Sequence, residues 1–235
     1  MTKWFVLLLA LLLRTAALTA ANAQESYPTR PIRLILPFPP GGAVDHVARL
    51  VTVRAAENLG QPFVMENKAG AGGVIATDAT AKARPDGYTL LLTTPNHTIS
   101  AALNAKLPYD AEKDLVPVSV VAEVPELLVS HPSAPFETFA GFVEYAKQNP
   151  GKLNYPGYEG ILWIGVVAPA GIPTPVIAKL ASAFQHAVAT VDLAERLKRD
   201  GVEPVGGTPE AFGALMASEI AQWRELGRAA GITLD

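Results

Sequence analysis

The stretch of residues 32–45 reads IRLILPFPPGGAVD and decides the fold of this chain. Residues 32–38 are apolar apart from Arg33, which is typical of a strand buried in a parallel sheet. Two prolines and two glycines then end the strand. Apolar residues next recur at the spacing of one helix face: Val44, Val47, Ala48 and Val51. Because Gly60 can end this helix, the segment predicts a strand, a glycine-rich loop and a helix.

Two similar units follow this one. Residues 63–65 read as a short strand, and a glycine-rich loop at 70–73 leads into a helix predicted over 74–83. A third strand, at 88–93, follows the turn pair Asp86-Gly87. Strands and helices that alternate at this spacing are typical of βαβ units, in which the strands run parallel.

The rest of the chain is organised differently. Residues 116–130 and 158–168 read as long extended segments, with a helix over 136–148 and a short strand over 153–155 between them. In the last third, Thr174-Pro175 and Thr208-Pro209 each predict a helix start, because threonine caps a helix and proline fits its first turn. The expected fold class is therefore α/β.

Residues 1–23 have the pattern of a signal peptide. Lys3 precedes an apolar run at 4–13 that is too short to span a bilayer, and Ala21-Asn22-Ala23 fits the small-residue cleavage rule. We expect cleavage after Ala23 and export, which in a Gram-negative cell means the periplasm; an uncleaved anchor is the alternative. Removal of Lys3 and Arg14 would lower the 19 basic residues to 17, against 22 acidic ones.

The composition excludes several classes of function. The 235 residues include no cysteine, so disulfides, thiol catalysis and cysteine-ligated zinc are ruled out. With 19 Lys and Arg against 22 Asp and Glu, the chain has no basic surplus for nucleic acid. No serine lies in a G-x-S-x-G motif, and metal-ligand spacing is lacking among His46, His97, His131 and His186. We therefore expect no enzymatic activity, no catalytic residue, no metal and no cofactor.

The three predicted parallel strands should end at one edge of the sheet, where open α/β sheets bind ligands. The first loop there, residues 38–42, has two glycines that let backbone N–H groups approach a ligand. The next helix points its positive end at the same place, so an anion site is expected that needs no basic side chain. A tight turn that binds nothing is the alternative. Asp45 can pair with Arg49 four residues on, so we favour structural capping over ligand contact for it.

The other two loops are less specific. Residues 67–73 match neither a Walker loop nor a G-x-G-x-x-G motif, so contact with a small anion or plain turn chemistry is favoured over nucleotide binding. His97 could donate to a ligand, although a lone histidine at a strand end is more often structural. The predicted ligand-binding residues are Phe38, Pro39, Pro40, Gly41, Gly42, Asp45, Thr93, Thr94, Asn96 and His97, with Gly70, Gly72 and Gly73 as a further cleft loop.

Longer motifs occur in a fixed order along the chain. They are YP at 27–28, PIR at 31–33, PFPPGG at 37–42, ENKAGAGG at 66–73, PDGY at 85–88, LPYD at 107–110, NPGKLNY at 149–155 and VAPAG at 167–171. With these motifs the chain resembles the substrate-binding proteins of tripartite tricarboxylate transporters, the Bug-type periplasmic receptors, over nearly all of its length after residue 23.

This resemblance implies a fold of the type II periplasmic-binding-protein kind, with two α/β lobes joined by crossing strands. Lobe one would comprise 24–119 and 159–235, and a truncated lobe two 120–158. It implies capture of a small organic carboxylate for a membrane permease, held by backbone groups and waters. Residues 38–42 match the binding loop of the first lobe, and residues 93–97 match a neighbouring cleft loop.

One departure from the family concerns the second lobe. In the family, a glycine- and serine-rich loop and several elements follow the KLNY motif, whereas here Tyr155 is joined directly to Pro156. Most of lobe two is therefore missing, and we expect Phe139, Phe142 and Val143 to be exposed or packed on lobe one. We also expect impaired binding. A remnant that binds no solute and a module that binds a protein partner are the alternatives.

Overall fold

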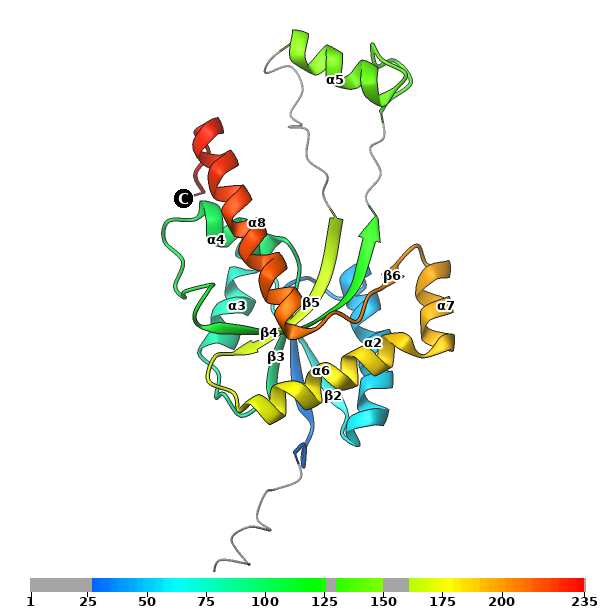
Figure 1. Ribbon diagram of the computed structural model, residues 1–235, viewed down its shortest axis with the longest axis vertical. Coiled ribbons are helices and arrows are strands. Elements are labelled where there is room, and N and C mark those ends of the chain that lie inside the picture. Colours follow the sequence, from blue (N-terminus) through cyan, green and yellow to red (C-terminus); the bar gives the residue numbers. More distant parts are fainter. Residues whose placement is uncertain (1–26, 126–129, 150–160, 235) are drawn as a thin grey trace, which may run out of the picture.

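The computed structural model describes residues 27–125, 130–149 and 161–234. In these ranges the centre of the molecule is a six-stranded sheet in the order β2-β1-β3-β5-β4-β6 (Figure 1). β1, β2 and β3 run parallel, whereas β5 is antiparallel to both β3 and β4, and β6 is antiparallel to β4. The α/β fold class is confirmed. The sheet is mixed: β1, β2 and β3 run parallel to one another, as expected, and the remaining pairings are antiparallel. The strands are β1 (Ile32–Leu36), β2 (Phe63–Asn67), β3 (Thr89–Thr93), β4 (Leu115–Pro125), β5 (Ile161–Pro169) and β6 (Glu203–Pro204).

Helices cover both faces of the sheet. α2, α6 and α7 lie on one face, and α3, α4 and α8 lie on the other (Figure 1). The helices are α2 (Ala43–Leu59), α3 (Val74–Ala81), α4 (Asn96–Leu103), α5 (Phe139–Gln148), α6 (Thr174–Ala189), α7 (Val191–Arg199) and α8 (Pro209–Ala230), and a short 3-10 turn, η1 (Ala71–Gly73), precedes α3.

Alternating side chains of the strands build the two cores. Leu34 and Leu90 point into the layer of α2 and α6, where Phe184 is also buried. Ile35 and Leu91, one residue further along each strand, belong to the second core with Phe212 of α8. This alternation is the pleat of a strand that is covered on both faces, and it explains why strands 32–36 and 89–93 are apolar almost throughout.

Most predicted helix boundaries are confirmed. α2 ends at Gly60, whose φ of 72° is the left-handed conformation expected for a glycine after a helix. The hydroxyl of Thr208 accepts a hydrogen bond from the Ala211 amide, as expected for a cap. α6 begins at Thr174, where a helix start was predicted. The predicted capping role of Thr174 is wrong, because Thr174 is itself the first helical residue and Pro173 precedes it without a side-chain cap.

The second-lobe segment is small. β4 and β5 pair along their length and lead to α5, which stands apart from the rest of the molecule (Figure 1). Phe139 is 67% exposed, as expected, but Phe142 is buried within its own segment against Phe136, at 5.3 Å between ring centroids. The expectation for Phe142 is therefore wrong, because the segment folds its aromatic residues onto each other. Residues 1–23, the 153–155 strand and the Tyr155-Pro156 junction lie outside the described residues.

A substitution at Gly165 on β5 can test the packing between the sheet and α8. An added Cβ at Gly165 would lie 2.3 Å from the Cζ atom of Phe212, so Gly165→Ala should force the buried ring to move. We expect a loss of about 1–3 kcal/mol in the free energy of unfolding in urea, the usual cost of overpacking. Gly42→Ala is the control, since an added Cβ there meets no atom within 4 Å. Equal stability of the two variants would contradict this packing.

Candidate functional site

The three predicted loops lie at one edge of the sheet. β2, β1 and β3 are neighbours and run parallel, so the loops after them begin side by side. The structure separates the predicted residues into two groups. The exposed ones are Pro39, Pro40, Gly41, Gly42, Gly70, Gly72 and Asn96, with Phe38 half-buried. The buried ones are Asp45, Gly73, Thr93, Thr94 and His97.

The carboxylate of Asp45 joins the first loop to its neighbours. One oxygen, Oδ2, accepts hydrogen bonds from the Gly41 amide at 3.1 Å and from Nε of Arg49 at 2.8 Å. The other, Oδ1, accepts from Nη2 of Arg49 at 3.1 Å and from the Asn67 side chain at 3.3 Å. The Asp45 side chain is only 4% exposed, so it supports the loop from below, as the capping interpretation predicts.

The electrostatics of Asp45 agree with this role. The hydrogen bond from Arg49 is the main cause that lowers the pKa of Asp45 to about 2, and the amides of Gly41 and Asn67 act in the same direction. Burial opposes this shift. The carboxylate is therefore ionised at neutral pH, and four donors occupy its oxygens, as expected for the capping role favoured for Asp45.

Asn67 supports the first loop and is absent from the predicted site residues. Its side-chain Nδ2 donates to the carbonyl of Phe38 at 2.9 Å as well as to Asp45. Asn67 is the last residue of β2, and β2 lies next to β1. A polar amide at the end of a neighbouring strand was the available signal. Through this residue the second glycine-rich loop starts at a fixed position relative to the first.

Backbone N–H groups remain available at this edge. The amide of Gly41 is occupied by Asp45, but the amides of Gly42 and Gly72 have no acceptor among the described residues. Gly42 precedes the first turn of α2, and Gly72 lies in η1 with a φ of 63°. The Gly42 amide at the positive end of the 17-residue helix α2, together with the Gly72 amide in the loop after the neighbouring strand, gives this edge donors suited to a small anion.

The third loop has one exposed and three buried members. Thr93, Thr94 and His97 are at most 4% exposed, whereas Asn96, the first residue of α4, is exposed. The imidazole of His97 stacks on Tyr109 at 6.4 Å between centroids, and its Nδ1 atom has no hydrogen-bond partner among the described residues. The structural interpretation thus suits His97, and Asn96 is the polar side chain that this loop offers to a ligand.

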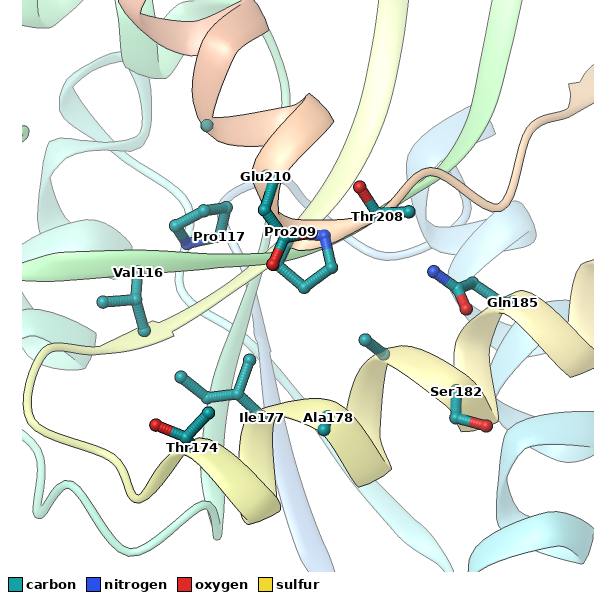
Figure 2. A pocket seen from close by; sticks show the side chains of 12 residues that line it. Val116, Pro117, Thr174, Ile177, Ala178, Ser182, Gln185, Thr208, Pro209 and Glu210 are labelled. Carbon is teal, nitrogen blue, oxygen red and sulfur yellow. The ribbon is translucent and has the colours of Figure 1, made fainter.

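A separate depression lies between α6 and α8. It has a volume of about 550 Å³, and in Figure 2 Ile177 and Ala178 of α6 lie across from Pro117 and Pro209. None of the predicted site residues lines it. Glu210 is its one charged lining residue, so this mostly apolar depression carries no positive charge for a carboxylate.

Two other kinds of site, a metal cluster and a membrane-spanning helix, are not found in the part of the chain that is described. No group of three or more His, Cys, Asp and Glu side chains there could hold a metal ion. Among the helices described, none combines the length and the apolar character that a membrane span requires.

Asp45 can be tested by substitution. Asp45→Ala removes the acceptor of four hydrogen bonds from a buried position, so we expect a loss of about 2–4 kcal/mol in the free energy of unfolding. Glu225→Ala is the control, because that carboxylate lies exposed on α8. Chemical denaturation measures both. If both variants lose the same free energy of unfolding, the Asp45 network does not stabilise the fold.

His97 predicts a pH dependence of stability. Burial lowers the pKa of His97 to about 4 from its usual 6.5, opposed by a hydrogen bond to the Ala111 backbone. Between these values the unfolded chain binds the proton and the folded chain does not, so stability is full above pH 6.5 and falls as the pH drops toward 4. From pH 7 to 4.5 this amounts to about 2 kcal/mol.

The measurement is urea denaturation across this range. His97→Phe keeps the stack on Tyr109 and should remove that part of the pH dependence, whereas His131→Phe, at an exposed position, should keep it. If His97→Phe loses stability on acidification as steeply as the unchanged chain, His97 is not the titrating group.

Sequence relatives share this architecture. BugT of Bordetella pertussis is 42% identical over 149 residues, which cover 63% of this chain and 46% of BugT. A UPF0065 protein from the tcbD-tcbE intergenic region of Pseudomonas sp. strain P51 is 27% identical over 301 aligned positions, 90% of each chain. An alignment of 301 positions is longer than the 235 residues here, so that relative contains internal residues that this chain lacks. The chain spans about half the length of BugT and several further curated relatives.

Solved structures with the same fold include receptors with bound acids. The periplasmic binding protein BugD has a TM-score of 0.75 at 25% identity, over 88% of this chain and 99% of BugD. Rpa4515 of R. palustris, solved with adipate, has a TM-score of 0.75 at 26% identity, over 88% of this chain and 99% of Rpa4515. MatC from Rhodopseudomonas palustris, solved with bound malate, has a TM-score of 0.72 at 25% identity, over 85% and 99%.

A family model matches most of the chain in two pieces. The TctC model, described as the tripartite tricarboxylate transporter family receptor, matches residues 47–162 and 156–232. The two matches meet near the junction at which the sequence departs from the family pattern. From the family model, the relatives and the fold together, this chain belongs to the TctC family of tripartite tricarboxylate transporter receptors.

Proposed function

We propose that this protein is a periplasmic solute-binding protein that captures a small organic carboxylate for a tripartite tricarboxylate-type permease. The observation that carries the proposal is the edge formed by the ends of β1, β2 and β3, where exposed amides meet the N-terminus of α2. Adipate and malate, the acids bound to Rpa4515 and MatC, indicate the ligand class. Export to the periplasm rests on the signal-peptide pattern of residues 1–23.

The ligand would be held mainly by backbone groups. We place its carboxylate near the amides of Gly42 and Gly72, with the Asn96 side chain as a further donor and Phe38 to Pro40 as an apolar wall. Asp45, Thr93, Thr94 and His97 would shape the loops from beneath. A chain with more acidic than basic residues can bind an anion in this way, because amide dipoles act at contact range while exposed charges are screened by salt.

The shortened second lobe should weaken binding. A receptor of two lobes surrounds its ligand and excludes water, whereas here α5 is the one helix described between β4 and β5. Loss of the opposing contacts removes hydrogen bonds and buried area, and every 1.4 kcal/mol lost weakens binding about tenfold. We therefore propose affinities orders of magnitude lower than those of a receptor with both lobes.

An alternative function is favoured by one observation. α5 carries a cluster of aromatic rings, and its Phe139 is 67% exposed. Contiguous exposed apolar patches often mark surfaces that bind other proteins, and we propose that Phe139 belongs to such a patch. A protein-interaction module, or a remnant that binds no solute, would keep the fold of lobe one and show no response to small acids.

Thermal unfolding with a panel of acids tests the proposed function. The mature chain from Gln24 is heated with adipate, malate and other small carboxylates at millimolar concentration. Ligand at a hundred times its Kd should add about 2.7 kcal/mol and raise the Tm by roughly 5–10 °C. Asn96→Ala should reduce the rise, and Asn58→Ala, exposed at the far end of α2, should not. A cooperative transition that no acid shifts would contradict solute binding and favour the alternatives.

A further inference from the structure

A buried carboxylate on α8 has no cationic partner in the described chain. Glu219 is 8% exposed, and none of the ion pairs found among the described residues includes it. A buried charged or polar group is costly unless hydrogen bonds satisfy it. The residues that supply these bonds therefore show what Glu219 holds together.

Two donors from different parts of the fold meet at this carboxylate. The indole N–H of Trp163 donates to Oε1 at 2.8 Å, and the hydroxyl of Thr98 donates to Oε2 at 2.7 Å. Trp163 is 1% exposed and Thr98 is 0% exposed, so water does not compete for these bonds. With both carboxylate oxygens engaged in a buried site, the geometry of the three side chains is fixed closely.

The hydrogen bond from Thr98 connects Glu219 to the edge of the sheet where the ligand is proposed to bind. Thr98 lies in the first turn of α4, and its hydroxyl is also 2.9 Å from the carbonyl of Pro95. Thr94 and Pro95 connect β3 to α4, and Asn96, the first residue of α4, carries the exposed amide side chain of the proposed site. Glu219 therefore fixes, through Thr98, the turn that presents Asn96.

The hydrogen bond from Trp163 connects Glu219 to β5, one of the two strands that lead to the second-lobe segment. Trp163 lies on β5 opposite Glu123 of β4, and these two strands form the ribbon that leads to α5 (Figure 1). The indole also packs edge-on against Phe212 of α8, at 5.1 Å between centroids. One carboxylate thus ties the inter-lobe ribbon and the ligand-edge turn of α4 to the same point of α8.

We infer that Glu219 is a positioning residue for carboxylate binding, which acts through Thr98 on the first turn of α4 and links that turn to the inter-lobe ribbon at Trp163. Glu219 does not touch the ligand in this proposal. The inference rests on the proposed function, since it concerns the same site. It assigns a binding role to a residue that is more than a hundred positions from the ligand loops in sequence.

The test compares full-length variants by calorimetric titration with adipate and with malate. Glu219→Met keeps the approximate length of the side chain but removes both acceptor oxygens, and Thr98→Val keeps the shape but removes the hydroxyl. Both lose the hydrogen bond between Thr98 and Glu219, so both should bind the acid that the unchanged chain binds about tenfold more weakly, the effect of one lost charged hydrogen bond. Glu225→Met, exposed on the same helix, is the matched control and should bind normally.

An NMR signal separates positioning from a loss of stability. The Trp163 indole N–H peak, assigned with Trp163→Phe, should shift when the unchanged chain is titrated with the acid. In Thr98→Val the bond from Trp163 to Glu219 remains, so the peak should persist but no longer respond at saturating acid. An unchanged response in Thr98→Val, or normal affinity in Glu219→Met, would overturn the inference and leave the proposed function standing. If the unchanged chain binds no acid of the panel used in thermal unfolding, the proposed function fails and the inference fails with it.

Discussion

The carboxylate of Asp45 is the interaction on which the candidate site depends. Its oxygens accept hydrogen bonds from the Gly41 amide, from Nε and Nη2 of Arg49 and from the Asn67 side chain, and the carboxylate is almost fully buried. The two glycines of this loop leave it many conformations in the unfolded chain, although its prolines restrict the rest of it. Because the charge of Asp45 must be satisfied by these particular donors, one conformation of the loop is selected. The same donors connect β1, α2 and β2, so the sheet edge and the site are fixed together.

The ion pairs near this edge determine which groups would be available to bind an acid in a protein with more acidic than basic residues. Asp45 pairs with Arg49, and the single carboxylate of Glu66 pairs with both Lys68 and Arg33, so each of these three cations already has an acidic partner. What remains are backbone amides and the N-terminus of α2. Such donors suit carboxylates of different shapes, which is consistent with a family whose structures include an adipate complex and a malate complex. Selection among acids would then fall to side chains such as Phe38 and Asn96, and to the opposite lobe.

Much of lobe one could be predicted from the sequence, because its signals are local. The apolar run at 32–36, the helical spacing after Val44 and the glycine at 60 each specify an element without help from distant residues. The directions of β5 and β6 could not be predicted in this way, since they depend on pairing with strands far along the chain. The same limit applies to the site. Asp45 and Arg49 are four residues apart, and their pair was predicted, whereas Asn67 and Glu219 act through contacts across 22 and 121 positions.

The central claim is that the edge of lobe one, with its free amides, holds the carboxylate. The most direct measurement is the amide NMR spectrum of the mature chain during titration with adipate. We predict that the amide signals of Gly42, Gly72 and Asn96 move together with one saturation curve, while that of Gly213, in the depression between α6 and α8, stays in place. Shifts confined to the surroundings of Gly213, or to α5, would contradict the claim and place any bound acid elsewhere on the molecule.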